Sequence, residues 1–170
     1  EKAAASATRP EGALPAAVLR PPLLVGRERE SAAFAAAWQR GAPIVVVGEA
    51  GIGKSRFVAE HTAGLRALLR SAARSGDAAQ PYALLTRVLR AALALLGRPP
   101  SPAVAQELAH LIPELGDARA LKSELDRARF LAAVDALLRA AAEAGAVAIV
   151  LDDLHNADRA SADALQHAAL

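Results

Sequence analysis

The apolar residues of this chain fall into two patterns, short continuous runs and longer stretches with a helical period. Residues 44–47 (IVVV) form a β-branched run flanked by Pro43 and Gly48, which predicts a strand buried on both faces. Residues 147–151 (VAIVL) form a similar run that ends at two aspartates, and we predict a second strand there. Residues 68–69 (LL) could close a helix or form another strand, and we favour the strand.

Five other stretches carry apolar residues at helical spacing. In the first, Phe34 and Trp38 lie four residues apart on one helical face, and Gly41 can supply a left-handed stop. The predicted helices cover residues 25–41, 53–64, 81–97, 101–111 and 121–143. In the last of these helices the apolar residues that keep a helical spacing are Leu125, Phe130, Val134, Leu137 and Leu138. Because strands alternate with helices, we predict an α/β fold, a parallel sheet with helices on both faces in three layers.

Residues 1–22 follow neither pattern. They mix Ala, Pro, Gly and isolated charges and end in the stiff Pro21-Pro22 pair, which is typical of a linker. We therefore expect residues 1–22 to connect an upstream domain to a folded part that covers residues 23–170.

Composition narrows the class of protein. Hydrophobic residues make up 54% of the 170-residue chain but aromatic residues only 3%, so a core must consist mainly of Leu, Val and Ile. The net charge of +2 gives no overall bias toward nucleic acid, and the absence of cysteine excludes disulfides and thiolate chemistry. No apolar run is long enough to span a membrane, and the amino terminus lacks a signal-peptide pattern. We expect a cytoplasmic protein with no membrane partner.

A glycine-rich motif follows the first apolar run. GEAGIGKS fits the pattern GxxxxGK(S/T) at every fixed position. In such a loop backbone amides point at phosphate oxygens, while Lys54 reaches the β- and γ-phosphates and the Ser55 hydroxyl binds Mg²⁺. The nucleotide-binding residues predicted here are Gly48, Glu49, Ala50, Gly51, Ile52, Gly53, Lys54, Ser55 and Arg56. The alternative is a structural turn with an exposed lysine, which the predicted strand before the loop and the predicted helix after it disfavour.

Two carboxylates follow the second apolar run. Asp152 ends the predicted strand, where P-loop proteins place a ligand of nucleotide-bound Mg²⁺. Asp153 would orient or deprotonate the attacking water, so Asp153 and Lys54 are the predicted catalytic residues. Taken alone, the pair could be a solvated turn. Beside a phosphate loop we favour a nucleotide site with ATP and Mg²⁺ as cofactors.

The remaining candidates carry weaker signals. His155 could sense the γ-phosphate or hydrogen-bond a loop, and the sequence favours neither. Asp158 is expected to cap a final helix rather than to bind a ligand. His61, His110 and His167 share no metal-ligand spacing and are expected on the surface.

Several motifs in a fixed order carry a family resemblance. LLVGRERE precedes GEAGIGKSRF, and GDAAQPYALLTRVLRAAL and VLDDLHNAD follow. Together they resemble the AAA-like ATPase module of large bacterial transcriptional regulators. These belong to the STAND class, the signal-transduction ATPases with numerous domains, which includes LuxR-type and SARP-type regulators. The resemblance covers residues 23–170.

The resemblance implies a site and an activity. It places Val25, Gly26 and Arg27 against the adenine side of the nucleotide, and it matches the family's phosphate and magnesium positions to Lys54, Ser55, Asp152 and Asp153. The implied module binds ATP or ADP, hydrolyses ATP slowly and controls an attached DNA-binding domain. DNA would be contacted only through domains outside this chain, and nucleotide-dependent self-association is also expected. The family places a further strand, an arginine sensor and a winged-helix segment after this point, so residues 23–170 are expected to be the N-terminal part of the domain.

Two other classes of protein share the same phosphate chemistry. One is an energy-using AAA ATPase such as a clamp loader or replication-origin protein. The other is an interaction scaffold that holds nucleotide without turnover. Steady-state turnover separates the three, because a switch is slow, a loader accelerates with DNA or a partner, and a scaffold does not turn over.

Overall fold

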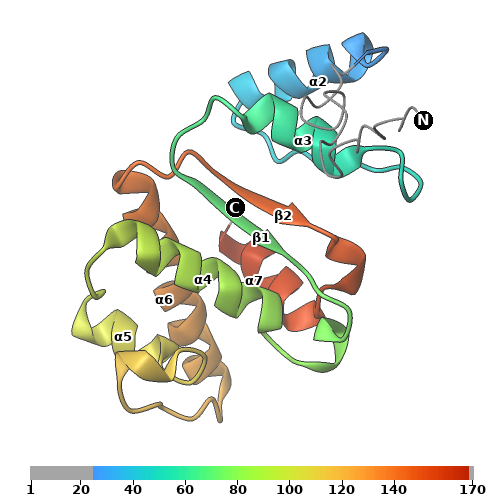
Figure 1. Cartoon of the computed structure of the whole chain (residues 1–170). Helices are drawn as coiled ribbons and strands as arrows, with labels where there is room; N and C mark the ends of the chain where they lie inside the picture. The colour runs from blue at the N-terminus through green and yellow to red at the C-terminus, as the bar shows by residue number, and fades with distance from the viewer. Residues whose placement is uncertain (1–24, 169–170) are drawn as a thin grey trace, which may run out of the picture. The chain divides into compact units, whose positions relative to one another are not determined.

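The computed structural model describes residues 25–168, and Figure 1 shows its helices and strands. The described residues form two units, residues 25–60 and residues 61–168. The linker predicted over residues 1–22 lies outside the described residues. None of the helices within residues 25–168 is long and apolar enough to cross a membrane.

The first unit contains helix α2 (Glu28–Gln39) and the start of helix α3 (Lys54–Thr62). In α2 the rings of Phe34 and Trp38 stack at 6.0 Å between centroids, and Phe57 of α3 meets Phe34 edge-on at 5.9 Å. Gly41 ends the helix with a φ of 63° and donates its amide to Trp38 O at 3.0 Å. The predicted first helix and its aromatic face are therefore confirmed.

The second unit is built on a parallel pair of strands, β1 (Leu68–Ala72) and β2 (Ala148–Asp152). Leu68 lies opposite Ala148 and Ala72 opposite Asp152. The strand that we favoured at residues 68–69 is thus confirmed, and the long connection between the strands carries three helices. Burial alternates along β1, with the Leu69 face covered and the Arg70 face exposed. Within this unit the helices cover one face of β1, whereas the sequence predicted cover on both.

Residues 44–47, predicted as a buried strand, do not form one. They carry no strand pairing, and Val45 and Val47 are 75% and 86% exposed. The run has the β-branched composition of a strand, but that composition only fits a half-buried pleated surface and does not supply a partner. Within residues 25–168 the one ladder is that of β1 with β2. The prediction of this strand was wrong, because no described strand pairs with residues 44–47.

Four helices make the core of the second unit. They are α4 (Ala83–Leu96), α5 (Pro102–Leu108), α6 (Glu124–Glu143) and α7 (Arg159–Ala168), as Figure 1 shows. Their apolar faces meet Leu69 of β1 in one cluster, in which Leu85, Leu89 and Phe130 are completely buried. Leu125 shares the helical spacing of this stripe but is 64% exposed, because it lies in the first turn of α6, before the buried residues begin.

The helix ends follow local capping rules. Gly97 ends α4 with a φ of 61°, and Ser101 accepts the amide of Val104 at the start of α5. At α6 the Ser123 side chain and Asp126 form a capping box, which sets the first helical residue at Glu124. The predicted helix over residues 121–143 therefore starts three residues later than expected.

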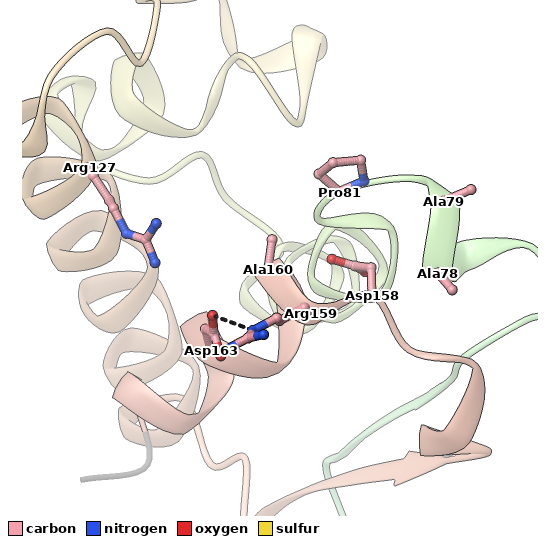
Figure 2. Close-up of a pocket in the computed structure, with 8 residues that line it drawn as sticks. All are labelled: Ala78, Ala79, Pro81, Arg127, Asp158, Arg159, Ala160 and Asp163. Carbon is pink, nitrogen blue, oxygen red and sulfur yellow. Dashed lines mark ion pairs between the residues drawn. The ribbon is translucent and has the colours of Figure 1, made fainter.

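One buried carboxylate holds the start of two helices. Asp158, which is 2% exposed, accepts the amides of Ser161 at 2.7 Å and of Tyr82 at 2.7 Å, with Leu84 at 3.4 Å. The Ser161 hydroxyl donates to Asp158 at 2.6 Å and accepts the amide of Leu85 at 2.9 Å. The predicted cap of α7 is confirmed, and the same carboxylate also caps α4. Figure 2 shows Asp158 between the first turn of α7 and the segment at Pro81.

This environment keeps Asp158 ionised. Desolvation by burial raises the pKa of Asp158, but the hydrogen bonds from Ser161, Tyr82 and Leu84 outweigh it and leave the pKa below its ordinary value. A folded pKa below the unfolded one means that folding favours the charged form. The contribution to stability is therefore complete above the unfolded pKa and is lost as the pH falls through the folded pKa.

We predict that Asp158→Asn makes the stability of the second unit less dependent on pH. At pH 7 the substitution should lower the free energy of unfolding by about 2 kcal/mol, because it weakens charge-assisted hydrogen bonds to buried amides. The gap between parent and variant should close as the pH falls below the ordinary pKa of aspartate and Asp158 becomes protonated in the parent. Urea unfolding at a series of pH values measures this gap.

Other carboxylates of the second unit also have a pKa below the ordinary value. The hydrogen bond from Arg87 lowers the pKa of Asp77, and the Ser123 hydroxyl lowers the pKa of Asp126. Both are unchanged by the substitution and cancel in the difference. Asp163→Asn is the matched control, because Asp163 is exposed on α7 and makes only a 4.0 Å ion pair with Arg159 (Figure 2). A gap that stays constant down to pH 2 would contradict an ionised cap.

Candidate functional site

The glycine-rich motif forms a turn that leads directly into α3. Gly53, the last residue before the helix, has a φ of 93°, a conformation that side-chain-bearing residues rarely adopt. At Gly48 an added Cβ would lie 3.1 Å from the Ile52 side chain. The Gly53 carbonyl accepts the amide of Phe57 at 2.8 Å, which begins the helix. The glycines therefore allow the chain to turn tightly and to enter α3 without an intervening residue.

Lys54 lies over this turn. Its ammonium donates to the carbonyls of Gly48 and Glu49, at 2.9 Å each. The amides of Gly51, Gly53 and Lys54 have no hydrogen-bond partner among the described residues. A lysine charge and unused amides at the start of a helix fit an anion with several oxygens, as a phosphate chain has. The predicted phosphate loop thus has the donors that its chemistry requires.

The structure brings Arg27 to the phosphate loop. Arg27 is the N-cap of α2, and its guanidinium donates to Ile52 O at 3.3 Å while forming an ion pair with Glu30 at 3.2 Å. Gly26 has a φ of 75° and donates its amide to Glu28 at 3.2 Å, whereas Val25 is 81% exposed. Of the three residues that the resemblance assigned to the adenine side, Arg27 is the one that contacts the loop.

The first turn of α3 carries the remaining predicted residues. Ser55 is exposed and Arg56 is half-buried, whereas Phe57 is 7% exposed and packs against Phe34. The sequence analysis missed Phe57 as the residue that fixes α3 to α2. The signal that could have found it is an aromatic residue three positions after Lys54, at helical spacing from the loop.

Asp152 and Asp153 form a turn at the end of β2. The Asp152 carbonyl accepts the amide of Ala73 at 3.0 Å, and its carboxylate accepts the amide of Asp153 at 3.0 Å. Asp153 is exposed and has φ 52° and ψ 38°, which is left-handed. Asn156 then donates its amide to Asp153 O at 2.9 Å. The two carboxylates therefore leave the strand on a sharp bend that the sequence did not predict.

These carboxylates fit the chemistry of magnesium. Mg²⁺ prefers oxygen ligands, keeps several waters and is bound through one or two carboxylates near substrate phosphates. Asp152 at the strand end carries oxygens of this kind. The phosphate loop belongs to the first unit and the two aspartates to the second.

The histidines lie in different environments. His155 and His167 are exposed, whereas His61, which was predicted on the surface, is half-buried. His110, predicted on the surface, is half-buried instead and packs edge-on against Phe130 at 4.8 Å and Tyr82 at 6.4 Å. Burial lowers the pKa of His110, and the Glu107 carbonyl beside its ring offsets only part of that effect. That prediction was wrong because the aromatic partner is twenty positions away in the sequence.

A glycine-rich loop that leads into a helix, with a lysine over it, is typical of α/β proteins that bind nucleotide phosphates. The AAA ATPase domain family model matches residues 23–169, and the chain belongs to this family. Members of this family generally bind ATP with Mg²⁺. Comparison with curated proteins finds no match, and neither does comparison with solved structures.

We predict that Gly53→Ala weakens nucleotide binding. A Cβ at a φ of 93° is strained, so the loop should shift and its amides should leave their positions. The expected loss of ATP affinity in the full-length protein is about tenfold, measured by calorimetry. Gly64→Ala is the control, because Gly64 has no positive φ and its Cβ would point into open space. Equal affinities of the two variants would contradict the role of this conformation.

Proposed function

We propose that this chain is the ATP-binding module of a regulatory switch that hydrolyses ATP slowly and controls an attached DNA-binding domain of a transcriptional regulator. The observation that carries the nucleotide part is the phosphate loop, where the Lys54 ammonium lies on two loop carbonyls beside unpartnered amides. Membership of the AAA ATPase domain family supports the same assignment. The order of the motifs, which resembles the STAND regulators, supports the regulatory part.

In this proposal each site residue has one task. The loop amides and Lys54 bind the phosphate oxygens, and Arg27 holds the loop through Ile52 O. Ser55 and Asp152 would hold Mg²⁺, which supplies charge neutralisation on the phosphates when bound. Asp153 orients the attacking water and accepts its proton. The exposure of Asp153 leaves its carboxylate accessible to such a water.

The rate of turnover tests the regulatory part of the proposal. A switch holds one nucleotide state long enough to be read by its partner domain, so hydrolysis in the full-length protein should be slow and insensitive to added DNA. Acceleration by DNA would favour a loader instead. Tight ATP binding with no hydrolysis would favour a scaffold.

We predict that Lys54→Ala lowers ATP affinity by about tenfold or more, because the amides alone cannot neutralise the β- and γ-phosphate charge. The fold should survive, since the lysine contacts only two loop carbonyls. Calorimetry in the full-length protein measures the affinity. Lys122→Ala is the matched control, an exposed lysine outside the loop. Unchanged affinity in Lys54→Ala would overturn the phosphate-loop assignment.

We predict that changing Asp152 or Asp153 to asparagine has different effects on ATP binding and hydrolysis. Asp152→Asn should reduce ATP affinity at limiting Mg²⁺, because a strand-end ligand of the metal is lost. Asp153→Asn should leave ATP bound and slow single-turnover hydrolysis by about a hundredfold, the contribution expected of a general base.

Titration of Mg²⁺ alongside single-turnover kinetics tests both halves of this prediction. Asp117→Asn is the control for an exposed loop carboxylate in the same unit. Hydrolysis at the parent rate in Asp153→Asn would mean that Asp153 is not the base. A normal magnesium dependence in Asp152→Asn would remove Asp152 from the metal site.

A further inference from the structure

The turn at Asp153 is held in a conformation that its own sequence does not favour. A left-handed backbone is unfavourable for a residue with a side chain, and it persists only where the surroundings impose it. Aspartate tolerates this conformation better than most residues, but its φ of 52° still needs support from both sides. The source of that support therefore bears on how the Asp153 carboxylate is presented.

On one side the support is the β ladder. The Asp152 carbonyl accepts the amide of Ala73, and the Asp152 carboxylate accepts the amide of Asp153, each at 3.0 Å. On the other side a single turn follows, in which Asn156 donates to Asp153 O at 2.9 Å and Ala157 to Leu154 O at 3.0 Å. Asp158 comes next, and it is the first buried residue after β2.

The Asp158 carboxylate is buried and fully used as a hydrogen-bond acceptor. It accepts four hydrogen bonds, from the amides of Tyr82, Leu84 and Ser161 and from the Ser161 hydroxyl. Tyr82 is itself left-handed, with a φ of 63°, and it is the N-cap of α4. The carboxylate thus ties a second unfavourable backbone position, 76 residues away, to the end of the Asp153 turn.

We propose that Asp158, together with Ser161, is a positioning residue for the Asp153 turn. It fixes the carboxyl end of the turn while the β ladder fixes the other end, and so it sets where the Asp153 carboxylate meets the attacking water. This inference rests on the proposed ATPase function. Asp158 itself touches neither nucleotide nor water in this assignment, because its four acceptor positions are occupied by protein donors.

Positioning and simple stabilisation predict different results. If Asp158 only stabilised the fold, its loss would lower the melting temperature, and the molecules that remain folded would hydrolyse ATP at the parent rate. If it positions the turn, folded molecules should bind ATP with the parent affinity, because the phosphate loop lies elsewhere in the chain, but hydrolyse it more slowly. The split between affinity and turnover therefore separates the two roles.

The experiment uses Asp158→Asn and Ser161→Ala in the full-length protein, at a temperature where circular dichroism shows both to be folded. Ser161→Ala keeps the carboxylate and removes only the hydroxyl that bridges it to Leu85, so it remains informative if the asparagine variant does not fold. Asp163→Asn and Ser75→Ala are the matched controls, because both residues are exposed. ATP affinity, single-turnover hydrolysis and amide hydrogen exchange at residues 156–157 are measured for each protein.

We expect exchange at residues 156–157 to rise about tenfold and hydrolysis to fall about tenfold, with affinity and both controls unchanged. Unchanged exchange in folded variants would overturn the anchoring. Faster exchange with parental hydrolysis would overturn the positioning role and leave the proposed function intact. A parent protein that binds no ATP would overturn the proposed function and this inference with it, and that failure is visible before any variant is made.

Discussion

The second unit depends on the buried negative charge of Asp158. Among residues 25–168 this carboxylate forms no ion pair, and its charge is balanced by the amides at the starts of α4 and α7 and by one hydroxyl. The positive ends of two helix dipoles converge on it, and this arrangement stabilises an anion. Because both helices contribute to the cluster around Leu85 and Phe130, the direction in which each enters the core is set at this one carboxylate.

In the phosphate loop a positive charge is likewise balanced by neutral polar groups of the backbone. There a cation, Lys54, is balanced by the carbonyls of Gly48 and Glu49 instead of by a carboxylate. Neutral carbonyls are weaker partners than a charged group, so the ammonium can exchange them for phosphate oxygens without breaking an ion pair. One charge is held permanently and organises the fold, whereas the other is held loosely and remains available to a ligand.

Local signals predicted most helices and one half of the Asp158 cluster. The cap of α7 could be predicted because Asp158 lies directly before the helix in the sequence. The loop at Lys54 could be predicted because the glycine motif is also local in sequence. The cap of α4 could not be predicted, because the amide of Tyr82 lies 76 residues before Asp158 and no sequence pattern links the two positions. The strand predicted at residues 44–47 was wrong, because these residues have a strand-like composition but pair with no strand among the described residues. The left-handed bend at Asp153 likewise depends on contacts that form only in the folded chain.

The long span closed by Asp158 also bears on the order in which the chain can fold during synthesis. Tyr82 and the start of α4 emerge from the ribosome well before Asp158, 76 residues later, and β1 likewise precedes its partner β2. Until that carboxylate emerges, the first amides of α4 have only water to bond, and the apolar face of β1 has no completed sheet behind it. Contacts of such high contact order form late, because the entropy of closing the loop is lost before they repay it. The helices between residues 83 and 143 can therefore associate early, whereas strand pairing and the Asp153 turn need β2 and Asp158, which come later in the chain.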